Sequence, residues 1–133
     1  MQGRLGMIGV CLGLAGVIWT QLPASDFSLA WQHSVEKVRW EEDYRVQHRQ
    51  LYLEHARVEG SGAGMEVPAQ ARFEHGRWHY RPDITLDILR LGRTPEAGDY
   101  QLCRAGGCLP MAHWLGAPTA AQPAVELWVC ELG

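Results

Sequence analysis

Hydrophobic and polar residues alternate with a period of two along residues 26–34, and the same alternation returns along residues 38–46. That period is typical of half-buried β-strands, because successive side chains of a strand point to opposite faces. We expect the two segments to pair as a hairpin with a loop at residues 35–38, which places Ser34 opposite Arg39. In that register all the apolar side chains share one face, and a slip of one residue would destroy the match.

Two ionisable residues fall on this otherwise apolar face. In the expected register His33 and Glu42 lie diagonally across the two strands, within reach of each other for long side chains. A buried carboxylate is costly unless it is paired and hydrogen-bonded, and an imidazole is a natural partner for it. Two interpretations follow: the pair is structural and fixes the hairpin, or it belongs to a ligand or metal pocket.

The rest of the chain also favours short strands separated by turns. Residues 111–115 fit a single helical turn that ends at Gly116. The pattern predicts an all-β fold, a small antiparallel β-sandwich or a partly open barrel of about 7–9 short strands. The segments expected to form strands or hairpins are 26–34, 38–46, 51–58, 73–80, 84–88, 100–109 and 125–130.

An apolar segment precedes these strands. Arg4 is followed by an unbroken run of fifteen apolar and glycine residues at positions 5–19. We expect an N-terminal apolar helix that acts as a signal peptide cleaved after Ala24 or, if uncleaved, as a membrane anchor. Residues 1–24 then form the targeting segment. Residues 25–133 form a single exported β-domain, in the periplasm or on the outer face of the cytoplasmic membrane.

Composition limits the size and the partners of this domain. The chain has 133 residues, of which 47% are hydrophobic and 20% charged, and its formal net charge is −3. That length suits one domain with a modest core. Acidic and basic residues are mixed along the chain rather than gathered into the basic stripe that a nucleic-acid binder needs. We therefore expect no nucleic-acid partner, and membrane contact only through residues 5–19 if they are not cleaved.

The cysteines indicate a disulfide. Cys103 and Cys108 flank a glycine-rich turn, where cysteines at facing hairpin positions of an exported protein are disulfide candidates. Cys130 is then the odd cysteine of the exported part, and its pairing with either of the other two is the alternative. A zinc site is the weaker interpretation, because the sequence holds no CxxC motif.

Motifs for catalysis or cofactor binding are not matched. The glycine cluster at residues 60–64 is not a GxSxG elbow, because Glu59 and Ala63 occupy the glycine positions. Nor is it a P-loop, since no Gly-Lys-Ser/Thr follows. Its backbone amides are able to form an anion-binding nest, although a plain glycine loop is the simpler interpretation. The six histidines include no HExxH motif, so the sequence predicts no cofactor, no metal and no catalytic residue.

Several short motifs resemble the signature of one family. They are WQHSVEK at 31–37, WEE at 40–42, GSGAGME at 60–66, WHYRP at 78–82 and LCRAGGC at 102–108. Over about residues 26–130 the chain is similar to the domain of unknown function 1850 family. The resemblance implies a small exported bacterial or archaeal protein whose gene neighbours those of TRAP transporters with TAXI-type solute-binding proteins. It implies an accessory role, with the transporter membrane subunit or the TAXI solute-binding protein as partner.

Two functional classes remain open from the sequence. The favoured one is a non-enzymatic envelope module that binds the transporter, its solute-binding protein or a small ligand. The alternative is a small periplasmic hydrolase or metal-dependent enzyme that uses His33 with nearby glutamates. The candidate polar cluster, for ligand binding or for structure, comprises His33, Ser34, Glu36, Glu41, Glu42, Ser61, Gly62 and Gly64.

Overall fold

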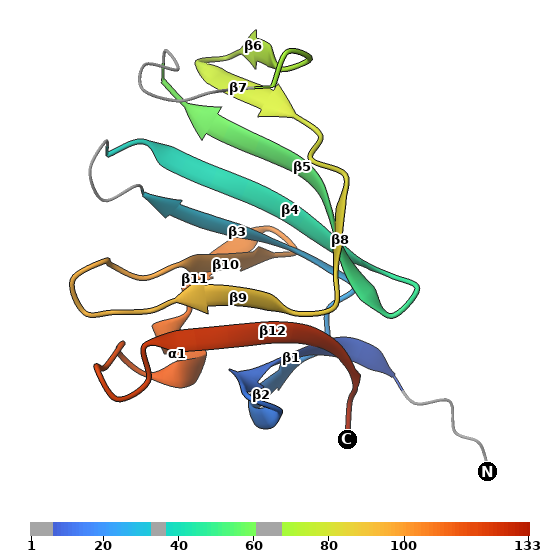
Figure 1. Cartoon of the computed structure of the whole chain (residues 1–133), viewed down its shortest axis with the longest axis vertical. Coiled ribbons are helices and arrows are strands. Elements are labelled where there is room, and N and C mark those ends of the chain that lie inside the picture. The colour runs from blue at the N-terminus through green and yellow to red at the C-terminus, as the bar shows by residue number, and fades with distance from the viewer. Residues whose placement is uncertain (1–6, 33–36, 61–67) are drawn as a thin grey trace.

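The computed structural model describes residues 7–32, 37–60 and 68–133. Within these ranges the chain forms twelve β-strands and one short helix, in two antiparallel sheets that do not close into a barrel (Figure 1). The smaller sheet, of order β2-β1-β12-β9, comprises β1 (Ile8–Leu14), β2 (Val17–Leu22), β9 (Leu89–Gly92) and β12 (Ala124–Glu131). The larger sheet has the order β11-β10-β3-β4-β5-β7-β6, and β8 pairs with β5 beside this path.

The larger sheet carries most of the segments that the sequence predicts as strands, and the predicted strand at 125–130 lies in β12 of the smaller sheet. Its members are β3 (Asp26–Gln32), β4 (Arg39–Gln47), β5 (Gln50–Glu59), β6 (Arg72–Glu74), β7 (Arg77–Tyr80), β8 (Ile84–Leu86), β10 (Gln101–Arg104) and β11 (Gly107–Pro110). The short helix α1 is Ala112–Leu115, which confirms the helical turn predicted there. The expectation of an all-β antiparallel fold is therefore confirmed, with more strands than expected within the described residues.

The two sheets share one hydrophobic core. Leu12 and Leu127 of the smaller sheet and Leu29 and Leu102 of the larger sheet are each at most 1% exposed. Fully burying one such side chain stabilises a fold by about 1.5–3 kcal/mol, so the contact between the sheets accounts for much of the domain's stability. Figure 1 shows the smaller sheet at one end of the molecule and β7 and β6 at the opposite end.

The expected N-terminal apolar helix is wrong. The apolar run instead forms strands β1 and β2, joined by a turn in which Ala15 and Gly16 have φ values of 51° and 83°. Positive φ at both central residues is the geometry of a type I′ hairpin turn. Val10 and Cys11 are fully buried against the core, and Cys11 forms a disulfide with Cys130 of β12. Among the described residues, no helix has the length and hydrophobicity needed to span a membrane.

The hairpin of β3 and β4 forms as the sequence predicts, but its register is different. Ser34 was expected opposite Arg39, whereas the structure pairs Gln32 with Arg39 and Trp31 with Trp40. The register is shifted by two residues, which leaves every side chain on its predicted face because the strand repeat is also two. Hydrophobic patterning opposes a slip of one residue and does not distinguish slips of two.

A buried ion pair fixes the segment between β9 and β10. Arg93, which is 4% exposed, donates to a carboxylate oxygen of Asp99 at 3.3 Å and to the backbone oxygen of Gly116 at 2.9 Å. Asp99 also accepts a hydrogen bond from the backbone N–H of Ala112 at 2.7 Å. These bonds connect the segment that carries Tyr100 to the start of helix α1, and so they position the Tyr100 ring.

Candidate functional site

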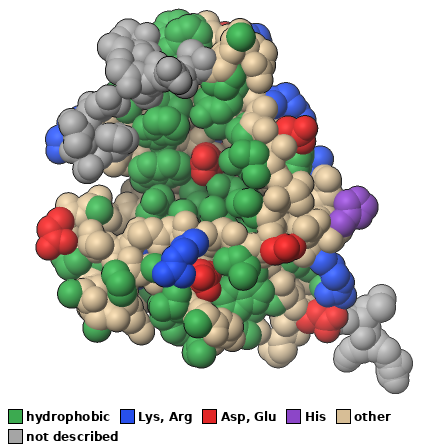
Figure 2. All heavy atoms as spheres, in the orientation of Figure 1, with side chains coloured by type: hydrophobic (Ala, Val, Ile, Leu, Met, Phe, Trp, Pro, Cys, Tyr) green, Lys and Arg blue, Asp and Glu red, His purple; other side chains and the backbone are tan. Residues whose placement is uncertain are grey.

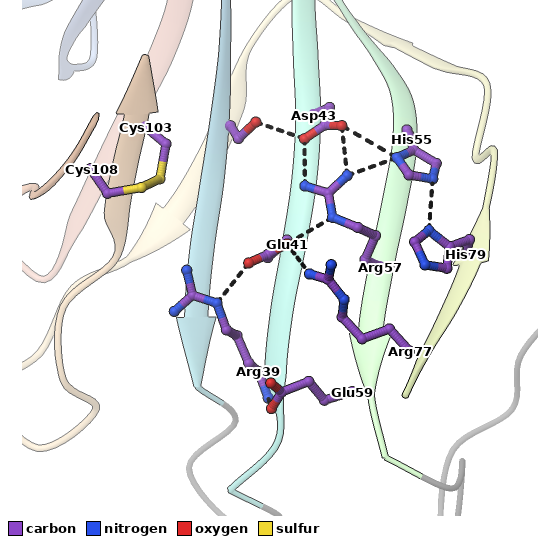
Figure 3. Close-up of polar contacts among 11 residues, drawn as sticks. Arg39, Glu41, Asp43, His55, Arg57, Glu59, Arg77, His79, Cys103 and Cys108 are labelled. Carbon is purple, nitrogen blue, oxygen red and sulfur yellow. Dashed lines mark hydrogen bonds and ion pairs between the residues drawn. A yellow bond between two sulfur atoms is a disulfide. The ribbon is translucent and has the colours of Figure 1, made fainter. Parts of the chain in front are cut away.

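Strand β4 presents two different chemical environments on its two faces. Glu41 and Asp43 lie on the outer face of the larger sheet, away from the core (Figure 3). Glu42 lies between them in the sequence and points to the inner face. The sequence analysis placed Glu41 and Glu42 in one candidate cluster. The structure separates them, because consecutive residues of a strand point to opposite faces.

On the outer face the acidic groups of β4 are neutralised by an arginine of β5. Arg57 donates from Nε to Glu41 at 2.7 Å and from its two terminal nitrogens to Asp43 at 2.7 and 2.8 Å (Figure 3). Burial raises the pKa of Asp43, but the hydrogen bonds from Arg57 and Ser28 outweigh burial and hold this pKa at about 2. Burial likewise raises the pKa of Glu41, and bonds from Arg39 and Arg57 produce a net lowering.

Two histidines extend this outer network. His55 Nδ1 lies 2.8 Å from the Arg57 guanidinium and 3.3 Å from Asp43, and His55 Nε2 lies 3.4 Å from His79 Nδ1. An arginine has only donors, so His55 Nδ1 accepts from Arg57 and its Nε2–H donates to His79. His79 Nε2 is then left as a buried donor with no hydrogen-bond partner among the described residues.

The outer network does not have the geometry of a serine hydrolase. Ser28 donates its hydroxyl proton to Asp43 at 2.6 Å rather than to an imidazole. A nucleophilic serine needs a base that accepts its proton, with the carboxylate behind that base. Within residues 7–32, 37–60 and 68–133 no group of three or more His, Cys, Asp or Glu side chains is arranged to hold a metal ion. The network therefore has the features of a structural ladder that links β3, β4, β5 and β7.

On the inner face the described residues give Glu42 no such compensation. Its one hydrogen bond from the described residues comes from the Tyr44 hydroxyl, which donates to Oε1 at 2.7 Å. No arginine or lysine of the described ranges forms an ion pair with it. Burial raises the pKa of Glu42, and the Tyr44 hydrogen bond only partly offsets this. A half-buried carboxylate with one neutral donor is an unusual cost for a fold to carry.

Aromatic residues flank Glu42 on the inner face, because Trp31 and Trp40 are its neighbours in the β3–β4 register. Trp31 stacks on Trp40 with 6.1 Å between ring centroids, and Tyr100 lies against Trp31 at 5.3 Å and an interplanar angle of 55°. Burial raises the pKa of the Tyr80 and Tyr100 hydroxyls, and the negative charge of Glu42 raises both further. Figure 2 shows hydrophobic side chains gathered over β3, β4 and β5, with an acidic side chain among them over β4.

A small cavity adjoins these rings. It has a volume of about 190 Å³ and lies between the end of β3 and the segment that follows β9. Trp31 and Tyr100 line this cavity together with Gly92, Gly98 and Asp99. Glu42 is not a lining residue, but it lies diagonally next to Trp31 in the β3–β4 register. Two unpaired indole N–H groups, of Trp40 and Trp78, are buried on the same inner face without a partner among the described residues. We call Glu42, Trp31, Trp40, Tyr44 and Tyr100 the inner-face site.

The predicted disulfide is confirmed. Cys103 and Cys108 face each other across the β10–β11 hairpin and are bonded (Figure 3). Cys130 pairs with Cys11, a partner that the sequence analysis assigned to the targeting segment. The Cys103–Cys108 hairpin borders a surface groove of about 720 Å³ that Arg104 and Trp114 also line.

The remaining predicted site residues are not placed by the structure. His33, Ser34, Glu36, Ser61, Gly62 and Gly64 lie outside the described residues. The pairing of His33 with Glu42 therefore stays a prediction. Glu42 does lie on the otherwise apolar inner face, as the sequence predicted.

Comparison with known proteins identifies the chain by family alone. A family model described as Domain of unknown function (DUF1850) matches residues 27–111. Neither the search of curated proteins nor the search of solved structures returned a match. The matched range contains β3 except its first residue, β4 to β11, and every member of the inner-face site.

Proposed function

This chain belongs to the domain of unknown function 1850 family, and from its own geometry we propose that it is a non-catalytic binding module of the cell envelope. The observation that carries the proposal is the inner-face site, where the Glu42 carboxylate lies among aromatic rings with Tyr44 as its one described donor. On the outer face the carboxylates of Glu41 and Asp43 are bonded to arginines, an arrangement that serves stability. A polar group left with spare hydrogen-bonding capacity in an apolar site is available to a ligand or partner.

An exported location fits the covalent structure. Both disulfides, Cys11–Cys130 and Cys103–Cys108, are of the kind that persists in oxidising compartments such as the periplasm. The family resemblance adds gene neighbourhood with TAXI-type TRAP transporters. We therefore place the module in the periplasm, as an accessory to the membrane subunit or the TAXI solute-binding protein of such a transporter, and regard its two sheets as a small open sandwich.

The test is co-purification from the native envelope. The tagged protein is expressed with the candidate transporter subunits and the TAXI protein, solubilised in mild detergent and captured. We expect the transporter components to co-elute with the wild-type protein and with Glu54→Gln, which removes an acidic group of the half-exposed Arg45–Glu54 ion pair. Glu42→Gln should weaken co-elution if the inner-face site is the contact. Absence of every transporter component from the wild-type eluate would refute the accessory role.

A further inference from the structure

The inner-face site carries a negative charge that the described part of the molecule does not balance. Its sequence neighbours Glu41 and Asp43 are each bonded to arginines, and the pKa values of both are lowered as a result. Glu42 has only the neutral Tyr44 hydroxyl, on Oε1, and Oε2 accepts no hydrogen bond from a described residue. On the same strand, Glu41 and Asp43 are bonded to arginines, whereas the described residues offer Glu42 no cationic partner.

The walls of the site favour a positive charge as well. The faces of tryptophan and tyrosine rings are electron-rich and attract a cation within about 6 Å of the ring centroid, most strongly where water is excluded. The Trp31 and Tyr100 rings lie with their centroids 5.3 Å apart at an interplanar angle of 55°, and both line the adjoining cavity. Trp40 adds a third ring, stacked on Trp31.

We propose that the inner-face site binds the primary ammonium group of a small organic cation. The ammonium group supplies three N–H donors, one of which satisfies the Oε2 acceptor of Glu42, while its charge lies against the Trp31 and Tyr100 rings. The organic part of the ligand occupies the adjoining cavity of about 190 Å³, which suits a ligand smaller than a typical drug. This inference rests on the proposed function as a binding module and names the class of ligand.

Other ligand classes fit the site less well. An organic anion would be repelled by the negative charge of Glu42. No arginine or lysine is among the described residues that line the adjoining cavity, so no cationic side chain there would bind the anion. A neutral apolar molecule would pack against the rings but would leave the Oε2 acceptor unsatisfied, which costs free energy in a half-buried position. Charge therefore distinguishes the three classes when size and shape are held constant.

The test uses three probes of equal chain length: n-pentylammonium, 1-pentanol and pentanoate. Isothermal titration calorimetry of the full chain with each probe at pH 7.5 measures the dissociation constants. We expect pentylammonium to bind about tenfold or more tightly than pentanol, which corresponds to about 1.4 kcal/mol, and pentanoate to give no measurable heat. Equal affinity for pentylammonium and pentanol, or tighter binding of pentanoate, overturns the inference.

Two variants locate the binding. Glu42→Gln keeps an oxygen for the Tyr44 hydroxyl but loses the charge, so pentylammonium affinity should fall about tenfold while pentanol affinity is unchanged. Glu54→Gln, a charge-matched control on β5, should leave both affinities unchanged. Thermal unfolding of each variant establishes that it is folded before titration. A folded Glu42→Gln protein with unchanged pentylammonium affinity overturns the inference.

The two experiments distinguish a failure of the accessory role from a failure of the proposed ligand class. If pentylammonium binds through Glu42 but no transporter component co-purifies, the ligand class stands and the accessory role is refuted. If the transporter co-purifies but the three probes bind alike or not at all, the accessory role stands and the ligand class is refuted.

Discussion

Removal of residues 1–24 at the predicted cleavage point should unfold the domain. The structure places β1 and β2 inside the fold, where β1 pairs with β12 over six residue pairs from Ile8 to Gly13. A chain that begins at Ser25 lacks both strands and leaves Cys130 without its disulfide partner. The sequence interpretation, in which this segment is a cleaved signal peptide, predicts instead a stable domain from residue 25 onward.

The magnitude follows from burial. Val10, Leu12 and Leu22 are at most 3% exposed, and burial of each contributes about 1.5–3 kcal/mol, or about 4.5–9 kcal/mol together. The disulfide between Cys11 and Cys130 has a sequence separation of 119 residues. In the chain-entropy description a loop of that length contributes about 5 kcal/mol. Both losses are comparable with the entire stability of a small domain, which is about 5–15 kcal/mol.

The assay is urea unfolding followed by far-ultraviolet circular dichroism. We compare the full chain, the chain that begins at Ser25, and a full-length Cys11→Ala/Cys130→Ala variant. The double variant keeps both strands and loses only the cross-link, so it should unfold cooperatively at a lower urea midpoint. The truncated chain should show no cooperative transition. A truncated chain with a cooperative transition at the full-length midpoint would refute our reasoning, and mass spectrometry of the mature protein would then show an N-terminus near residue 25.

Further predictions concern the outer ladder, the inner carboxylate and the local disulfide. Arg57→Leu leaves Asp43 without its arginine partner, while Glu41 keeps Arg39 and Arg77, and should cost about 3 kcal/mol in urea unfolding. Arg45→Leu, from a half-exposed ion pair, should cost less than about 1 kcal/mol, and equal losses would contradict the ladder. The pKa of Asp43 is lowered from 3.8 to about 2, so the stability that its carboxylate contributes is present above pH 3.8 and is lost as pH falls towards 2. In Asp43→Asn the urea midpoint should therefore depend less on pH in this range. The pKa of Glu42 is raised above 4.5, so the folded state holds this proton more tightly than the unfolded state does, and stability should decline as pH rises above 4.5. If the same decline is seen in Glu42→Gln, Glu42 is not its source. Peptide mapping without reductant should show the Cys103–Cys108 link, with an intact mass about 4 Da below that of the fully reduced chain; any other pairing of these two cysteines contradicts the assignment.

Periodicity was sufficient to assign the faces of β3 and β4. It placed Glu42 on the inner face correctly, because a side chain's face depends only on whether its position is odd or even. The same property explains the two-residue error in register, which no pattern of period two can detect. The outer ladder was missed for a related reason: a bulge between Asp43 and Tyr44 shifts the pairing of β4 with β5, so that Arg57 meets Glu41 only in the folded sheet.

The N-terminal hairpin was missed because its burial removes the alternation that identifies strands. Five consecutive residues of β1 are buried, and a strand buried on both faces gives a continuous apolar run. Such a run has the same composition as a signal-peptide core or a short apolar helix. The turn at Ala15 and Gly16 lacks the Asn-Gly or Asp-Gly pair that most strongly signals a hairpin.

The position of β1 between β2 and β12 sets an order of events during synthesis. β1 is synthesised well before β12, so the edge of β1 that pairs with β12 has no native partner until β12 has been made. The Cys103–Cys108 link needs only a hairpin and can close early, whereas Cys11 must wait for Cys130. An apolar strand with one exposed edge is prone to aggregation, so we expect the partly made chain to bind a holdase chaperone that covers β1.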